Sequence, residues 1–151
     1  MKPGNVVNLE RPLAASALVL RSGVRDEGRL GGHFVQGHVD GIGRVTRIVP
    51  EGDNWCLSVR VPEDLRRYVA EKGSIAVDGT SLTVACWQDG IADFAIIPFT
   101  YAHTNIAAMS PNDAVNLECD ILAKYVESLL DARKGHAASH LTVARLVEEG
   151  F

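Results

Sequence analysis

A glycine-rich run at residues 31–41 holds two histidines, His33 and His38, together with the hydrogen-bonding side chains of Gln36 and Asp40. Glycine within a strand marks a bulge or a close approach by a ligand or another backbone. Imidazole transfers protons near neutral pH, so both histidines are candidates for acid–base chemistry; hydrogen bonding inside a barrel explains them equally well. Residues five apart on a strand point to opposite faces, which argues against a metal site.

A second run, residues 72–84, combines a lysine with paired hydroxyls. Ser81 and Thr83 are two apart in a strand pattern, so they face one way while Leu82 and Val84 face the other. Two hydroxyls on one face can donate to and accept from the amide edge of a heterocycle. Strand-forming residues that simply face solvent give the same pattern, and both interpretations stay open.

The third run, residues 96–100, has Pro98 where a strand should end. Proline has no N–H, so backbone groups beside it are free to meet a ligand. Taken alone, this run indicates only an edge or a bend.

Short alternating segments position all three runs. Apolar and polar residues alternate over 55–61, which predicts a half-buried strand. The same pattern predicts strands at 6–9, 33–39, 43–49, 74–77, 81–86, 92–97 and 115–119. Turn pairs such as Asp78-Gly79 separate them, and many short strands at such spacing favour a closed barrel or a sandwich. Pro62 predicts one short helix among the strands.

The pattern becomes helical after Asp120, which is a good N-cap residue. An apolar stripe follows, made of Leu122, Tyr125, Val126, Leu129 and Leu130. A basic pair and a glycine are then expected to end the helix: Arg133, Lys134 and Gly135. A second short helix is predicted at 142–149. The stripe needs a covering surface, either this chain's own barrel or copies of the helix in an oligomer.

A weak internal repeat suggests a duplicated domain. Val7-Asn8-Leu9-Glu10 recurs as Val115-Asn116-Leu117-Glu118, an offset of 115 − 7 = 108 residues. A period this long indicates tandem domains rather than a solenoid. We therefore expect residues 1–30 to hold the last strand of a preceding barrel and a linker, 31–120 to form one barrel, and 121–151 to form a C-terminal helical tail.

Composition describes an ordinary globular protein. The 151 residues are 46% hydrophobic and 23% charged, with 15 Lys and Arg against 19 Asp and Glu, a net charge of −4. No basic block is present, so nucleic acid is not an expected partner. Three widely spaced cysteines, Cys56, Cys86 and Cys119, indicate free thiols in a reducing cytoplasm. No apolar run reaches the roughly 18–20 residues of a membrane helix, so we expect a soluble protein.

In order, spacing and identity, these runs resemble riboflavin synthase. The matching motifs are Gly-Gly-His-Phe-Val-Gln-Gly-His-Val-Asp-Gly at 31–41, Lys-Gly at 72–73, Asp-Gly-Thr-Ser-Leu-Thr-Val at 78–84, Ile-Pro-Phe-Thr at 97–100 and the final Val-Asn-Leu-Glu. The resemblance covers nearly the whole chain, and the first motif is specific to that family.

The resemblance implies an all-β fold class, with two six-stranded Greek-key lumazine-binding barrels in tandem, a C-terminal helix and assembly as a trimer. It implies no cofactor and no metal. The family dismutates two molecules of 6,7-dimethyl-8-ribityllumazine: one gives a four-carbon unit to the other, yielding riboflavin and 5-amino-6-(D-ribitylamino)uracil. Each active site lies between the N-terminal barrel of one subunit and the C-terminal barrel of a neighbour.

Carried over residue by residue, the resemblance places substrate binding on Gly37, His38, Val39, Lys72, Ser81, Leu82, Thr83, Ala95, Ile96, Ile97, Pro98, Phe99 and Thr100. Catalytic roles fall on His38, Ser81 and Thr83. A lumazine methyl group is acidified by charge delocalised into the ring, so the protein must accept a proton and stabilise a ring anion. His38 is expected to shuttle the proton, the hydroxyls to polarise the heterocycle, and Lys72 to favour negative charge or contact the ribityl hydroxyls.

Two departures from the family matter. The family's N-terminal barrel is absent, and the segment 14–27 is longer than the usual connector, which puts unaided catalysis in doubt. A non-catalytic lumazine- or flavin-binding module similar to lumazine protein is the main alternative, and a subunit whose chief role is assembly through the tail helix is another.

Overall fold

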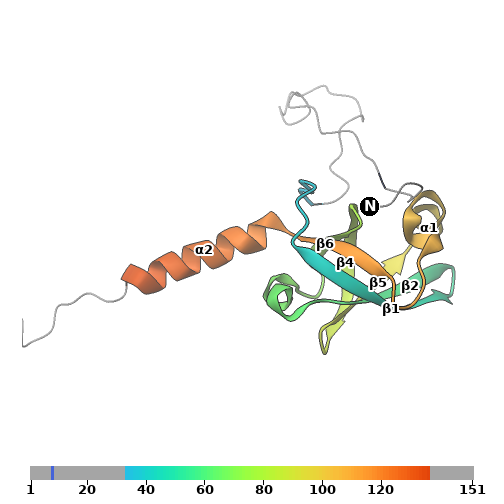
Figure 1. Cartoon of the computed structure of the whole chain (residues 1–151), viewed down its shortest axis with the longest axis horizontal. Coiled ribbons are helices and arrows are strands. Elements are labelled where there is room, and N and C mark those ends of the chain that lie inside the picture. Colours follow the sequence, from blue (N-terminus) through green and yellow to red (C-terminus); the bar gives the residue numbers. More distant parts are fainter. Residues whose placement is uncertain (1–7, 9–32, 137–151) are drawn as a thin grey trace, which may run out of the picture. The chain divides into compact units, whose positions relative to one another are not determined.

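Six antiparallel strands form a closed barrel in the computed structural model, which describes residue 8 and residues 33–136. The strands are β1 (Gly41–Glu51), β2 (Asn54–Arg60), β3 (Ser74–Val77), β4 (Thr80–Gln88), β5 (Ile91–Ile96) and β6 (Ala114–Cys119). Around the barrel they follow the order β1-β2-β5-β4-β3-β6, and β6 pairs back onto β1 (Figure 1). Because β3, β4 and β5 are successive neighbours and β2 lies beside β5, the order is a Greek key. The predicted barrel is confirmed.

One face of every strand fills the barrel interior, as alternation requires. The largest fully buried side chains are Phe94, Leu57, Ile75, Ile96, Ile106 and Leu117. Burying a side chain of this size contributes about 1.5–3 kcal/mol. The interior is therefore a packed apolar core, and polar chemistry is left to the outer wall.

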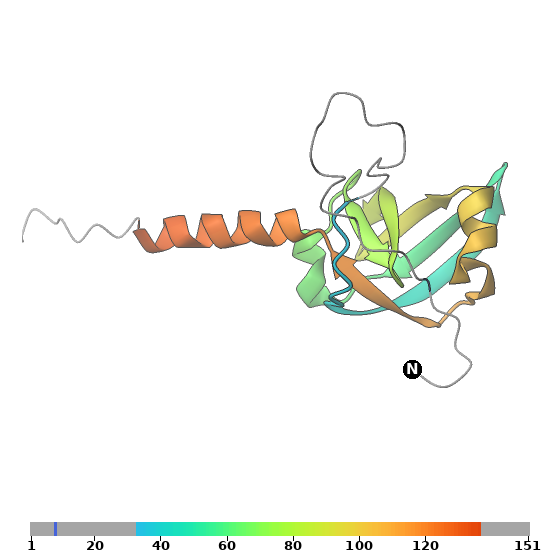
Figure 2. The same cartoon turned by 90° about the horizontal axis from the view of Figure 1, so that it is seen from above.

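Short helical segments close the two ends of the barrel (Figure 2). The 3₁₀ helix η2 (Glu63–Tyr68) follows Pro62 as predicted and places Leu65 in the core. At the other end α1 (Pro98–His103) and the 3₁₀ helix η3 (Asn105–Ala108) contribute Ile106 to the core. Trp55 of β2 stacks on Tyr101 of α1, with ring centroids 3.9 Å apart. This stack holds α1 against β2.

The contacts divide the chain into two units, Met1–Asp120 and Ile121–Phe151. Helix α2 (Ile121–His136) begins directly after Asp120, as predicted. Its apolar stripe is exposed: Leu122, Tyr125, Val126, Leu129 and Leu130 are each more than half accessible. Among the described residues, no helix has the length and apolar character needed to cross a membrane.

The structure corrects the prediction of a strand at 33–39. Residues 33–40 are irregular, and β1 begins only at Gly41. The glycines that suggested a close approach also break the strand, since Gly37 has φ +78°, outside extended geometry. Strand β5 ends at Ile96, one residue earlier than predicted, because Pro98 occupies the first turn of α1. Of the predicted strand at 6–9 only Asn8 is described, and the predicted helix at 142–149 lies outside the described residues.

Candidate functional site

The irregular segment 33–40 lies along the outer wall of the barrel and is held there by Glu118 of β6. The Gln36 N–H donates to Glu118 Oε1 at 2.6 Å, and the Gly37 N–H donates to Oε2 at 2.9 Å. Glu118 points outward between the inward-facing Leu117 and Cys119, yet it is only 6% exposed. An outward-facing carboxylate is buried here because the segment covers it.

Asp40 fastens the end of the same segment to the backbone of β6. Its N–H donates to the Leu117 carbonyl at 2.8 Å, and its carboxylate Oδ2 accepts from the Cys119 N–H at 2.8 Å. Hydrogen bonds to charged groups contribute about 1.5–3 kcal/mol each, roughly twice an ordinary bond. The two acidic side chains therefore replace the strand pairing that the segment lacks.

His33 and Ser81 meet at the start of the segment. The His33 Nδ1 and the Ser81 Oγ lie 2.8 Å apart, and the His33 N–H donates to the same Oγ at 3.4 Å. The other ring nitrogen, Nε2, is buried and has no partner among the described residues. A buried polar atom left unpaired costs about 1–3 kcal/mol. The pair is thus a hydroxyl and an imidazole in contact, with the second imidazole nitrogen buried and unpaired among the described residues.

Ser81 and Thr83 share the outer face of β4, as the alternation predicted. Leu82 and Val84 lie in the core, whereas Ser81 is half-buried and Thr83 is exposed. Across the pairing with β3, Ala76 lies opposite both Ser81 of β4 and Glu118 of β6. The hydroxyl pair and the Glu118-held segment therefore lie on one continuous part of the wall.

The lysine and the end of β5 border the hydroxyl pair. The Lys72 N–H donates to the Val84 carbonyl at 2.8 Å, with Lys72 in the left-handed region at φ +63°. Val84 pairs with Phe94, so Thr83 and Ala95, the next residues on each strand, follow on the outer face. Ala95 is exposed there.

The structure separates the other predicted binding residues by their exposure. Most are open to solvent: Gly37, His38, Val39, Lys72, Ile97, Pro98 and Phe99. The side chains of Leu82 and Ile96 point into the core and are 8% and 1% exposed. Only the backbone of these two residues can face a ligand on the wall. Phe99 is 68% exposed and stacks on His103, and Thr100 is half-buried.

Residues 36–120, which include most of this wall, match the family model described as the lumazine binding domain. The chain belongs to the lumazine-binding domain family. Riboflavin synthase of Actinobacillus pleuropneumoniae is 38% identical over 152 residues, covering 100% of this chain and 66% of the relative. Riboflavin synthase of Mycobacterium tuberculosis is 40% identical over 134 residues, covering 86% of this chain and 61% of the relative. The chain spans about half to two thirds of the length of such relatives.

Solved structures show the same fold. LumP complexed with riboflavin superposes with a TM-score of 0.57 at 23% identity, covering 60% of this chain and 50% of that chain. LumP complexed with 6,7-dimethyl-8-(1'-D-ribityl) lumazine has a TM-score of 0.56 at 24% identity, covering 62% and 52%. The lumazine-binding barrel is thus a shared architecture.

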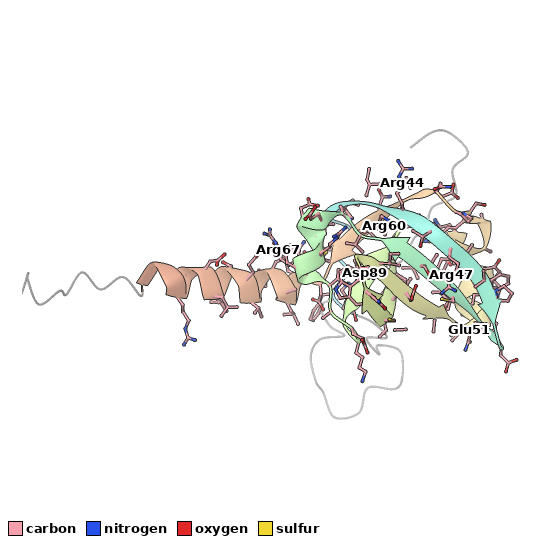
Figure 3. The ribbon with its side chains drawn as sticks, turned by 90° about the horizontal axis from the view of Figure 1, so that it is seen from below. Arg44, Arg47, Glu51, Arg60, Arg67 and Asp89 are labelled. Carbon is pink, nitrogen blue, oxygen red and sulfur yellow. The ribbon has the colours of Figure 1, made fainter. Side chains whose placement is uncertain are left out.

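Two open hollows lie further along the outer wall of this lumazine-binding barrel. The larger, about 340 Å³, contains Arg47, Ser58, Cys86 and Asp93 and none of the predicted binding residues. Arg47 lies on the barrel among the charged side chains labelled in Figure 3. Its Nε donates to Ser58 Oγ at 3.3 Å, and that hydroxyl donates to Asp93. The smaller, about 220 Å³, includes Ala95. Within residues 8 and 33–136, no three His, Cys, Asp or Glu side chains gather as metal ligands. Apart from Ala95, the predicted binding residues line neither of these two hollows, and most of them are exposed.

Sequence reasoning identified only one of the two side chains that organise this surface. It named His33 as a candidate for acid–base chemistry or for hydrogen bonding in the barrel, without its partner Ser81. It noted Glu118 only as part of the repeat. A signal for Glu118 was available, because a carboxylate alternates with Leu117 and Cys119 in a strand otherwise rich in buried residues. Its partners are backbone N–H groups more than 80 residues away, which no local pattern identifies.

Proposed function

We propose that this barrel is the ligand-binding part of a riboflavin synthase, a transferase that dismutates 6,7-dimethyl-8-ribityllumazine to riboflavin and 5-amino-6-(D-ribitylamino)uracil. The observation that carries the proposal is the pair of hydroxyls, Ser81 and Thr83, on one open face beside the imidazole of His33. The family match and the riboflavin synthase relatives support the same ligand class.

In this proposal the heterocycle lies across the outer wall. Ser81 and Thr83 donate to and accept from its amide edge, together with backbone groups around Ile97. Lys72 borders them and favours negative charge on the ring or contacts the ribityl hydroxyls. Exposed Phe99 and Val39 offer apolar surface to the ring.

The acid–base role is assigned to the imidazoles. Loss of a proton from the lumazine methyl group leaves its electron pair delocalised in the ring, and a base must take the proton. His38 is exposed and follows Gly37 at the open edge of the segment, which suits exchange with water. His33 contacts Ser81 directly, so we give it the role of orienting that hydroxyl and accepting its proton.

The proposal predicts that the 151-residue chain binds riboflavin and 6,7-dimethyl-8-ribityllumazine. Flavin fluorescence should change on titration with a folded sample. Thr83→Ala should weaken binding by about 0.5–1.5 kcal/mol, the worth of one hydrogen bond, with little loss of thermal stability because Thr83 is exposed.

Ser110→Ala is the matched control for this titration, since Ser110 is an exposed hydroxyl outside the predicted site. It should leave the affinity unchanged. Absence of binding at millimolar ligand by the folded chain would reject the site. Loss of thermal stability in Thr83→Ala with unchanged affinity would show that the hydroxyl is structural.

We also propose that α2 assembles the chain into a homo-oligomer, a trimer as in the family that the sequence resembles. Leu122, Tyr125, Val126 and Leu129 repeat at helical spacing and are 55–67% exposed. Leu129→Glu should therefore shift the chain to monomer in sedimentation velocity, whereas Ser128→Glu, an exposed neighbour, should not. A monomeric wild-type chain would show that the stripe has another covering surface.

We place the protein in the cytoplasm, a reducing compartment. None of Cys56, Cys86 and Cys119 forms a disulfide, and Cys86 is exposed. Free exposed thiols suit a compartment in which thiols are kept reduced.

A further inference from the structure

Four polar side chains form a row across the outside of the barrel. Arg47 of β1 lies opposite Ser58 of β2, and Ser58 lies opposite Asp93 of β5. Cys86 of β4 completes the row on the far side of Asp93. Side chains directly opposite on neighbouring strands have Cβ atoms about 4.5–5.5 Å apart. The row therefore places a guanidinium, a hydroxyl, a carboxylate and a thiol next to one another on four adjacent strands.

Two β-bulges turn the ends of this row outward. Strict alternation would point Arg47 inward, because it comes two residues after the buried Val45. Cys86 stands in the same relation to the buried Val84. The strand pairing shifts register at both places, and the extra residue in each strand leaves Arg47 and Cys86 exposed on the outer wall. Bulges that re-aim a side chain in this way are over-represented next to active sites.

The charged groups of the row are anchored but are not paired with each other. Ser58 is only 3% exposed, and its hydroxyl donates to Asp93 Oδ1 and accepts from Arg47 Nε at 3.3 Å. The Arg47 Nη2 donates to Cys56 Sγ at 3.2 Å. Within the described residues no ion pair joins Arg47 to Asp93, and the Ser58 hydroxyl lies between them. Guanidinium and carboxylate are therefore held apart, and each keeps hydrogen-bonding capacity, at Nη1 and at Oδ2.

The row faces the larger hollow, of about 340 Å³. Arg47 contributes a positive charge from β1, whereas Asp93 and Asp89 contribute negative charges from β5 and from the turn between β4 and β5. Sites for small molecules have volumes of about 300–1,000 Å³. The hollow thus has the size of a small-ligand site, with a positive end and a negative end, and it includes none of the predicted lumazine-binding residues.

We infer that this hollow binds a small zwitterion, an α-amino acid or a related compound that carries one ammonium and one carboxylate. The ligand's carboxylate accepts from the Arg47 guanidinium, and its ammonium donates to the Asp93 carboxylate, with Asp89 nearby. A simple anion would be repelled by the two aspartates, and a simple cation would be repelled by the arginine. A ligand that carries both charges a short distance apart satisfies both ends. The inference does not depend on lumazine binding or on turnover.

NMR amide shifts of the 151-residue chain test the inference, with glycine as the probe. Glycine should shift the amides of β2 and β5 around Ser58 and Asp93 in a saturable way. N-Acetylglycine lacks the ammonium and glycinamide lacks the carboxylate, so each should bind about tenfold more weakly or worse, the equivalent of one lost charge-assisted hydrogen bond. Absence of saturable shifts with glycine would overturn the inference. Equal binding of either blocked form would also overturn it, since the hollow would then be a plain anion or cation site.

Two substitutions test the two ends of the hollow separately. Arg47→Gln and Asp93→Asn each remove one charge, and Ser58 keeps a hydrogen-bond acceptor in both variants. Each should weaken glycine binding about tenfold or more. Arg44→Gln and Asp53→Asn, exposed side chains of the same types outside the hollow, are the matched controls and should leave the affinity unchanged. Dispersed barrel amides in each spectrum show that the variant is folded. Wild-type affinity in folded Arg47→Gln or Asp93→Asn would overturn the inference.

Discussion

Supplied on its own, the 151-residue chain is expected to form little riboflavin from 6,7-dimethyl-8-ribityllumazine. The proposed reaction consumes two identical molecules, and the barrel presents one exposed surface around Ser81 and Thr83. A second barrel must cover that surface to hold both reactants face to face. Well-oriented reactants gain about 7–11 kcal/mol over a bimolecular encounter. Supplying the N-terminal barrel of a related synthase, in trans or fused before Val6, should therefore raise turnover on the order of 100-fold or more.

The colour difference between substrate and product gives the assay. Any residual activity of the chain should increase with protein concentration, because two copies must pair with their open surfaces opposed. A fusion carrying Ser81→Ala and Thr83→Ala is the control and should lose the gain while remaining folded. Turnover by a demonstrably monomeric chain, unaffected by dilution or by the added barrel, would show that one surface suffices.

The barrel itself was predictable because its strands follow a period of two. Leu57 and Val59 alternate with outward neighbours, and turn pairs such as Asp78-Gly79 mark the ends of the strands. The helix after Asp120 was predictable for a similar reason, since an N-cap residue and an apolar stripe are local signals. Closure and the order of strands depend on pairings far apart in the sequence, such as β1 with β6. For these the resemblance to a known family was needed.

The candidate site was predictable only in part. Alternation correctly put Ser81 and Thr83 on one face of β4. For the same reason it put Leu82 in the core. The family resemblance nevertheless counted Leu82 among the binding residues. The segment at 33–39 looked like a strand because its residues alternate, but Gly37 breaks that geometry. A tertiary contact holds the segment in its irregular form. The carboxylate from β6 accepts hydrogen bonds from backbone N–H groups of the segment, and these bonds take the place of strand pairing.

The second large prediction concerns this carboxylate and the substitution Glu118→Ala. This change removes both acceptors for the Gln36 and Gly37 N–H groups and uncovers the wall beneath them. Each hydrogen bond to a charged group contributes about 1.5–3 kcal/mol, and the freed N–H groups are rehydrated, so we expect the free energy of unfolding to fall by about 2–3 kcal/mol. Urea unfolding measures this loss, and Glu51→Ala, an exposed glutamate of β1, is the matched control.

Glu118→Ala should also weaken lumazine binding, although Glu118 itself is covered by the segment and is not expected to touch the ligand. Gly37, His38 and Val39 are expected to contact the ligand, and the Glu118 carboxylate helps to keep them on the wall by holding Gln36 and Gly37. Glu118→Gln retains one oxygen acceptor and should give an intermediate loss of both stability and affinity. Faster hydrogen exchange confined to residues 34–40 would identify release of the segment as the cause. If affinity survives in Glu118→Ala while these amides exchange freely, the segment takes no part in binding, and the site reduces to Ser81, Thr83 and their neighbours on β4 and β5.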